Sequence, residues 1–226
     1  AKRGWLVLAS IMWVCLVLAA ARPQWLGEPV NVPNEGREMM LAVDLSGSMK
    51  IEDMMVNGRQ VNRLTMIKSV LYDFIQRRVG DRLGLILFAD TAYLQAPLTY
   101  DRETVATLLD EAVIGLVGEQ TAIGDAIGLA VKRFEQKAES NRVLILLTDG
   151  QNTAGNITPQ QAKELAVDAQ VTVYTIGVGA DAMTVSSFFG SRQVNPSQEL
   201  DETMLTDIAK ATGGQYFRAR NAAELE

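Results

Sequence analysis

The sequence predicts an α/β protein: a doubly wound, mostly parallel sheet preceded by one transmembrane helix. Between Arg37 and Glu226, short apolar segments of strand length alternate with amphipathic segments of helical period, which is the pattern of a parallel sheet covered by helices on both faces. An uncharged apolar run, Gly4–Ala21, comes before them. The chain has 226 residues, 48% of them hydrophobic, so it can fill the core of one domain of ordinary size.

The apolar run 4–21 predicts a transmembrane helix. At the rise of an α-helix it is about 27 Å long, close to the hydrocarbon thickness of a bilayer. Trp5 and Trp25 lie near its two ends, where interfacial aromatic residues commonly anchor such helices. A cleaved signal peptide is the alternative interpretation, because the small residues before Arg22 resemble a cleavage site.

Charges beside the run predict its orientation and the layout of the chain. Lys2 and Arg3 favour a cytoplasmic stub at 1–3, so that everything after the span crosses to the other side of the membrane. Residues 22–36, with three prolines and two glycines, are expected to form a linker, and 37–226 the folded domain. The sequence begins without Met, which leaves open that it is a piece of a longer protein with further spans.

The expected strands are mostly apolar throughout rather than alternating. Residues 83–88 and 143–147 are the clearest examples, and such runs are typical of strands that are buried on both faces. The segment 91–99 contains Pro97, which suits a strand at the edge of the sheet because proline donates no ladder hydrogen bond. The expected strands are 37–46, 81–89, 91–99, 142–150, 171–179 and 215–220.

Helix starts carry recognisable capping residues. Thr158 precedes Pro159, a hydroxyl cap followed by a first-turn proline, and Asp201 precedes an acidic first turn. The long segment 180–199 lacks periodicity and contains the adjacent Phe188–Phe189, so we expect a small hairpin or a contact site there. The expected helices are 63–79, 101–112, 122–137, 158–170 and 201–214.

Composition excludes several classes of function. The formal net charge is −6 and the pI about 4.9, without a basic stripe, which argues against a nucleic-acid partner. Histidine is absent, and this removes His-based acid–base chemistry, serine and cysteine triads and most zinc sites. The single cysteine, Cys15, can form no internal disulfide and does not indicate a redox compartment.

Oxygen-bearing side chains gather where the expected strands end. Asp44, Ser46 and Ser48 occupy alternate positions after the first strand. Asp149 follows the strand at 143–147, and Thr121 lies in a loop between two helices. Ligands of an open parallel sheet bind beyond the carboxyl ends of its strands. Because carboxylates and hydroxyls are the ligands of hard cations, these five residues predict a site for Mg²⁺, or for Mn²⁺ or Ca²⁺.

Such a site would carry little negative charge. Two carboxylates only balance a divalent ion. If Asp149 acts through a water molecule, the ion keeps net positive character and one exchangeable position. A carboxylate supplied by a protein partner would complete the shell.

The five residues also resemble a known motif. Residues 44–48, DLSGS, match the DxSxS motif of von Willebrand factor A domains, Thr121 matches the lone threonine of their second loop, and 148–150, TDG, match the third loop. Together they resemble the metal-ion-dependent adhesion site of that family. The order of elements over about 190 of the 226 residues resembles the family's doubly wound fold.

This resemblance implies a role for each residue. Asp44, Ser46 and Ser48 would be direct or nearly direct metal ligands. Thr121 would be a ligand that can bind the metal or withdraw from it, and Asp149 would often bind the metal through a water molecule. The sequence departs from the family before the threonine, where relatives frequently have glycines and this chain has Glu119 among GEQT. That charge would either weaken the capture of an acidic partner or simply point to solvent.

A closer resemblance is to bacterial Bat-type aerotolerance membrane proteins. It rests on ARPQW at 21–25, LAVDLSGSMKIEDM at 41–54 and LDETMLTDIAKATGGQYFRA at 200–219. The resemblance implies a domain between helices of the bacterial inner membrane that faces the periplasm. It further implies other Bat proteins and a MoxR-type AAA+ ATPase as partners, with a role in assembly or chaperoning.

Less specific interpretations of these segments stay open. Residues 44–48 could be an Asx-type loop whose serines serve only as helix caps. Asp125 could lie behind the metal ligands or be an ordinary first-turn acid. Residues 50–63 could face a partner, although a solvated loop is what we expect there.

Two other functions compete with a metal-dependent binding module. One is a scaffold with a vestigial metal site. The other is a magnesium-dependent hydrolase of the phosphoaspartate kind, in which Asp44 would attack a phosphate. Such hydrolases usually need a second acid two residues later as proton donor, and that position is Ser46. Because histidine is absent as well, we expect no enzymatic activity.

Overall fold

The structure is a computed structural model that describes residues 2–21, 36–56, 58–134, 141–181, 183–187 and 190–221, with the side chains of 2 and 183–194 left out. Contacts divide the chain into two units, 1–34 and 35–226. Most of the expected linker, Arg22, Trp25 and Phe188–Phe189 lie outside the described residues.

The first unit contains helix α1, Lys2–Ala21. Its part Arg3–Ala21 is long and apolar enough to cross a membrane, and none of it is buried within the protein. Large apolar side chains such as Trp5 and Trp13 are therefore exposed along its length. A signal sequence near the N-terminus passes the same test of length and composition, so a cleaved signal peptide stays the alternative interpretation.

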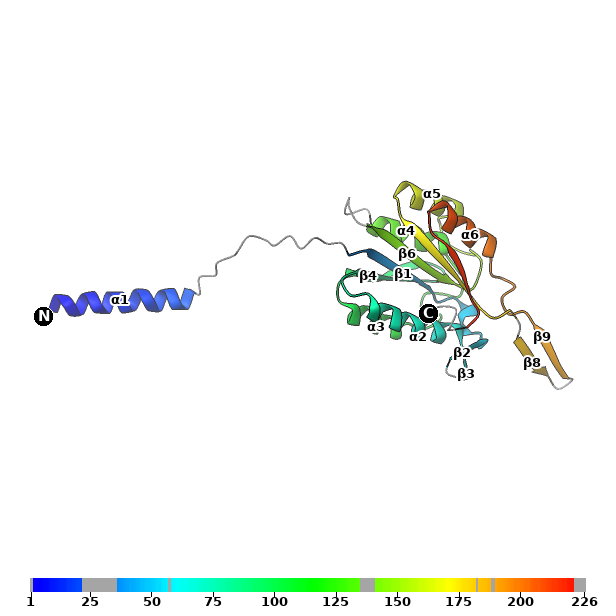
Figure 1. The fold of residues 1–226 in the computed structure, drawn as a ribbon, viewed down its shortest axis with the longest axis horizontal. Coiled ribbons are helices and arrows are strands. Elements are labelled where there is room, and N and C mark those ends of the chain that lie inside the picture. Colours follow the sequence, from blue (N-terminus) through cyan, green and yellow to red (C-terminus); the bar gives the residue numbers. More distant parts are fainter. Residues whose placement is uncertain are drawn as a thin grey trace. The chain divides into compact units, whose positions relative to one another are not determined.

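The second unit is built on a six-stranded sheet with the order β10-β7-β6-β1-β4-β5 (Figure 1). All neighbouring pairs are parallel except β4 and β5. The proline-containing strand β5 lies at the edge, as expected. The predicted α/β class is confirmed. The strands are β1 Glu38–Asp44, β4 Arg82–Phe88, β5 Ala92–Thr99, β6 Arg142–Thr148, β7 Thr172–Val178 and β10 Tyr216–Ala219.

Helices cover both faces of this sheet (Figure 1). The strand β1 is buried along its whole length, because alternate side chains enter two separate cores. Met39, Leu41 and Val43 pack with α2 and α3, whereas Met40 and Ala42 pack with α4, α5 and α6. This explains why the central strands are apolar at successive positions. The helices are α2 Arg63–Arg77, α3 Arg102–Asp110, α4 Ile123–Phe134, α5 Pro159–Asp168 and α6 Glu202–Ala211.

The predicted helix starts at Thr158 and Asp201 are confirmed. The side chain of Thr158 accepts a hydrogen bond from the Gln161 amide, and the Gln161 side chain accepts one from the Thr158 amide, forming a capping box before Pro159. The Asp201 carboxylate accepts the amide of Met204. Short polar side chains therefore define where α5 and α6 begin.

Two small hairpins extend from the sheet domain. The first pairs β2, Met54–Val56, with β3, Arg59–Val61. The expectation of a solvated loop at 50–63 was therefore wrong in part, because Met54 is fully buried. The second pairs β8, Met183–Ser187, with β9, Gly190–Val194, which confirms the hairpin expected in 180–199.

Close approach of α4 to the loop before α5 gives a stability prediction. A Cβ atom at Gly124 would collide with the backbone carbonyl of Ile157, whereas one at Gly128 would meet only the flexible end of the Ile157 side chain. We expect Gly124→Ala to lower the free energy of unfolding by about 1–3 kcal/mol. Gly128→Ala, the matched control, should change it by about 1 kcal/mol or less, since alanine also favours the helix.

Urea denaturation followed by near-ultraviolet circular dichroism of the tyrosines measures both variants. Equal stability of the two alanine variants would contradict the close packing of α4 on this loop.

Candidate metal centre

Three loops meet at the carboxyl edge of the sheet. The first begins at Asp44, the second contains Thr121 and the third contains Asp149. Asp44 is the last residue of β1, and Asp149 directly follows β6, the parallel neighbour of β1. Thr121 lies two residues before α4. Parallel pairing of β1 with β6 therefore puts two carboxylates at the same end of adjacent strands, where ligands of such sheets bind.

The first loop turns its polar groups toward one another. The Ser46 amide donates to Asp44 Oδ1 over 2.8 Å, and the hydroxyls of Ser46 and Ser48 are 3.1 Å apart. A single 3₁₀ turn, η1 Gly47–Lys50, follows Ser46 and brings Ser48 to the same side. The Ser46 amide thus holds the Asp44 carboxylate, while the Ser46 hydroxyl lies within hydrogen-bond distance of the Ser48 hydroxyl.

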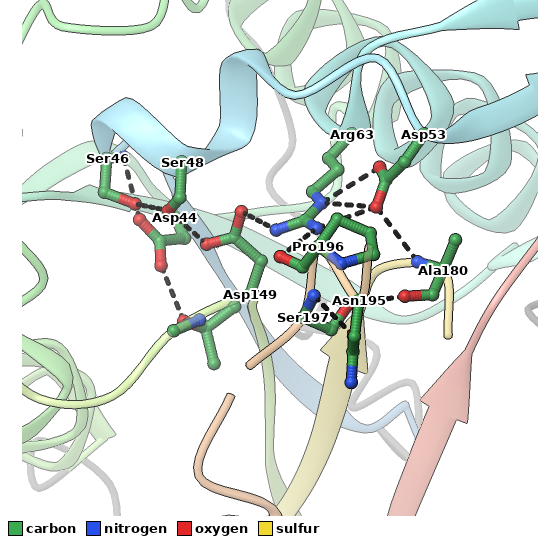
Figure 2. A network of polar contacts seen from close by, with 12 residues as sticks. Asp44, Ser46, Ser48, Asp53, Arg63, Asp149, Ala180, Asn195, Pro196 and Ser197 are labelled. Carbon is green, nitrogen blue, oxygen red and sulfur yellow. Dashed lines mark hydrogen bonds and ion pairs between the residues drawn. The ribbon is translucent and has the colours of Figure 1, made fainter. Parts of the chain in front are cut away.

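The third loop is bonded directly to the first (Figure 2). Ser48 Oγ donates to Asp149 Oδ1 over 2.6 Å, and Thr148 Oγ1 donates to Asp44 Oδ2 over 2.6 Å. Asp44 and Asp149 are 0% and 1% exposed. Two side-chain bonds thus hold both buried carboxylates in place.

The second loop is tied to both of the others through its backbone. The Gly47 amide donates to the Glu119 carbonyl over 3.0 Å. The Thr121 amide donates to Thr153 Oγ1 over 2.9 Å, and the Thr121 carbonyl accepts the Thr153 amide over 2.8 Å. Thr121 is thereby fixed beside the third loop.

A hollow of about 270 Å³ opens between the three loops. Ser48 and Thr121 both lie on its wall, so the second loop faces the hydrogen-bonded cluster of the other two. The structure therefore brings four of the predicted residues into one cluster and places the fifth, Thr121, beside it. The hollow is lined by Ser48, Glu119, Gln120, Thr121, Gly150, Gln151, Thr153 and Glu199.

The donor set fits a hard divalent cation. Every predicted ligand offers a hydroxyl or carboxylate oxygen, which suits Mg²⁺, Mn²⁺ or Ca²⁺ better than metals that prefer nitrogen or sulfur. Within the described ranges no group of three His, Cys, Asp or Glu residues could hold a metal. Hydroxyls would therefore have to complete the shell, as the alternate serines allow.

Electrostatics at the cluster favour a cation. Burial, followed by the charge of Asp149, raises the pKa of Asp44 to about 7. Burial also raises the pKa of Asp149, although the nearby Arg63 opposes that effect. Both carboxylates are thus costly to keep ionised, and a cation bound to them would stabilise the charged forms.

Sequence reasoning missed Arg63, the first residue of α2. Its side chain is 1% exposed, and Nη1 donates to Asp149 Oδ2 over 2.8 Å. Nη2 donates to Asp53 Oδ2 over 2.7 Å (Figure 2). Burial lowers the pKa of Arg63, but its hydrogen bonds with Asp53 and the charge of Asp149 outweigh this and raise it.

A signal for Arg63 was present in the sequence. It lies on the same stripe of α2 as the buried Ile67 and Val70, four and seven residues later. A charged residue on a core-facing stripe indicates a buried partner of opposite charge.

The capping interpretation of 44–48 is not supported. Ser46 precedes η1 without a side-chain capping bond, and α2 is capped instead by Asn62, which accepts the Thr65 amide. Asp125 accepts the amides of Asn156 and Ile157 through Oδ1, so it anchors the loop before α5.

Glu119 has a mostly solvated side chain. It is 78% exposed and lies 3.7 Å from Lys50, in an ion pair of exposed groups. Such a pair contributes little to stability. Its carboxylate stays available at the rim of the hollow.

A larger hollow of about 850 Å³ lies at the opposite, amino-terminal edge of the strands. It is lined by residues such as Arg37, Asn141 and Gln170 and by none of the predicted ligands. Of the five predicted ligands, Ser48 and Thr121 line the smaller hollow instead.

Comparisons with known proteins agree with this fold. The family model for the von Willebrand factor type A domain matches residues 38–226. A protein of Borreliella burgdorferi, described only as uncharacterized, is 29% identical over 218 residues, which is 95% of this chain and 62% of that protein. The chain thus spans about three fifths of the length of this curated relative.

Two solved structures are similar in both fold and sequence. BatB from Bacteroides thetaiotaomicron has a TM-score of 0.67 and 28% identity, covering 84% of this chain and 94% of that one. An aerotolerance-related membrane protein from Bacteroides fragilis has a TM-score of 0.66 and 29% identity, covering 84% and 95%. Both resemblances drawn from the sequence are confirmed. The chain belongs to the von Willebrand factor type A domain family.

Proposed function

We propose that this chain is a membrane-anchored von Willebrand factor A domain that binds a divalent cation and, through it, an acidic residue of a protein partner. The observation that carries the proposal is the 2.6 Å bond from Ser48 to Asp149, which joins two loops 101 positions apart in one oxygen cluster. The cation is Mg²⁺, with Mn²⁺ or Ca²⁺ as substitutes. The proposed ligands are Asp44, Ser46, Ser48, Thr121 and Asp149.

Family membership supports a metal at this place, because von Willebrand factor A domains commonly bind a divalent metal at the matching motif. A bound cation would supply an electrophilic position for a carboxylate oxygen of the partner. Arg63 already offsets the charge of Asp149. The site therefore supplies less negative charge than its two carboxylates suggest, which favours an additional acid from outside.

The membrane setting is supported by the apolar helix α1 and by the description of the Bacteroides fragilis neighbour as a membrane protein. We propose a cytoplasmic stub at 1–3, a span at 4–21, a linker at 22–36 and the domain at 37–226. The domain would face the periplasm from the bacterial inner membrane. Its partners would be other Bat proteins and a MoxR-type AAA+ ATPase, in a system for membrane assembly or chaperoning.

A scaffold with a vestigial site is the second candidate. The exposed Glu119 and the intramolecular bonds of Ser48 and Asp149 favour it, since these bonds satisfy the cluster without a metal. A phosphoaspartate hydrolase is disfavoured because Ser46 stands where the proton donor is needed. The relatives reported above are not named as enzymes.

Titration calorimetry of the full chain in detergent with Mg²⁺ and Mn²⁺ tests the proposal. We expect the titration to show one saturable site. We also expect a partner to be isolated with the chain from solubilised membranes, to be released by a chelator and to bind again when Mg²⁺ is added. The absence of heat with both metals would favour the scaffold instead.

A further inference from the structure

One guanidinium joins the metal centre to a distant part of the fold. Arg63 donates to Asp149 through Nη1 over 2.8 Å and to Asp53 through Nε and Nη2, at 3.0 and 2.7 Å. Nη2 also donates to the Pro196 carbonyl over 3.0 Å. A planar guanidinium with five donors can serve several partners at once in this way, which a lysine ammonium cannot reproduce.

Asp53 extends the network to the other side of the same segment. The Ala180 amide donates to Asp53 Oδ2 over 3.0 Å, and Ser197 Oγ donates to the Ala180 carbonyl over 2.8 Å. Residues 180 and 196–197 flank the hairpin of β8 and β9. The Arg63–Asp53 pair therefore holds both ends of the segment that carries this hairpin (Figure 2).

The backbone is shaped for this contact. Gly179 has a φ of +140°, a conformation that side chains rarely adopt, and a Cβ there would collide with Ser197 Oγ and press on the Arg63 guanidinium. In the described part of the chain, β8 and β9 pair only with each other. The hydrogen bonds described above tie the base of the hairpin to the rest of the domain.

The charges in this network do not balance by themselves. Arg63 pairs with Asp53 and Asp149, and the charge of Asp149 acts in turn on the buried Asp44, so these four groups carry a formal charge of −2 when all are ionised. A divalent cation supplies the charge that the buried groups lack. Asp149 divides its two oxygens between Ser48 and Arg63, so it belongs to the metal centre and to the hairpin base together.

We propose that Arg63 is a positioning residue that couples the metal centre to the β8–β9 hairpin, so that cation binding at the centre orders the base of the hairpin. The inference rests on the proposed metal-binding function. When the bound cation restrains Asp149 at Oδ1, the whole carboxylate is fixed, including Oδ2, which accepts the hydrogen bond from Arg63. Arg63 in turn fixes Asp53 and the Pro196 carbonyl.

Hydrogen-exchange mass spectrometry of the full chain in detergent tests the coupling, with saturating Mn²⁺ compared with chelator. We expect amides in 179–200 to exchange more slowly with Mn²⁺, by about threefold or more, because local opening at the hairpin base becomes less favourable. A purely structural Arg63 would give no metal-dependent difference.

Two variants sharpen the test. Ser197→Ala removes a bond at the hairpin base without touching the metal centre, so Mn²⁺ should bind as in the wild type while the slowing at 179–200 is reduced. Arg63→Lys keeps the charge but cannot span all its partners, so the slowing should disappear at saturating Mn²⁺. Near-ultraviolet circular dichroism reports whether Arg63→Lys is folded. If it is not, the comparison of wild-type protein with Mn²⁺ and with chelator decides whether the metal centre and the hairpin are coupled.

The outcomes separate the two proposals. Wild-type protein that binds Mn²⁺ without any change at 179–200 overturns the coupling and leaves the metal-binding function standing. Wild-type protein that does not bind Mn²⁺ overturns both.

Discussion

Asp44→Ala is expected to abolish magnesium binding while the domain stays folded. The Asp44 carboxylate is fully buried and accepts hydrogen bonds from the Ser46 amide and the Thr148 hydroxyl, which hold it beside the two serines. Its removal takes away one of only two carboxylates in the donor set. Mutation of residues that only hydrogen-bond to metal ligands already lowers metal affinity by about 10–100-fold. Loss of the ligand Asp44 itself should therefore weaken Mg²⁺ binding by at least about 100-fold.

The fold should survive because burial already disfavours the charged form of Asp44, whose pKa is raised to about 7. Calorimetry with Mg²⁺ and Mn²⁺ measures the loss, and circular dichroism checks the fold. Asp110→Ala, at an exposed position at the end of α3, is the matched control and should bind like the wild type. Equal heats from Asp44→Ala and the control would remove Asp44 from the site.

Arg63→Met is expected to give the largest loss of stability. The substitution leaves Asp53 and Asp149, both with 0% exposed side chains, without their shared cation. Removing one partner of a buried ion pair typically costs about 3–5 kcal/mol, because the remaining charge cannot reach water. The urea midpoint should fall accordingly.

The contrasting control is Asp207→Asn, which breaks the 2.7 Å pair of Lys163 with Asp207 on the surface. Asp207 is 60% exposed, so this change should cost about 1 kcal/mol or less. If Arg63→Met were no more destabilising than this control, the buried network around Arg63 would not stabilise the fold.

Sequence periodicity was sufficient to predict the sheet and its helices. Apolar runs such as 83–88 have few alternatives to a strand buried on both faces, and the capping residues Thr158 and Asp201 marked helix starts that the structure confirms. Four of the five proposed ligands were found because their oxygens lie at strand ends that a parallel sheet must bring to one edge, and Thr121 was found by its match to the second loop of the family motif.

The network behind the ligands was not predicted, because its contacts join residues far apart in sequence. Arg63 contacts Asp149 across 86 positions and Pro196 across 133. No periodic pattern encodes such pairs. The short strand β2 was missed for a related reason, since a three-residue strand with only Met54 fully buried has too little alternation to be recognised.

An anomalous difference map from crystals of the chain grown with Mn²⁺ shows whether the three loops bind one cation through their oxygens. We predict one Mn²⁺ peak in the hollow, within about 2.2 Å of the hydroxyl oxygens of Ser46 and Ser48 and with Asp44, Thr121 and Asp149 around it. A map in which Mn²⁺ binds elsewhere, or in which these side chains turn away from one another, would rule out the proposed metal site.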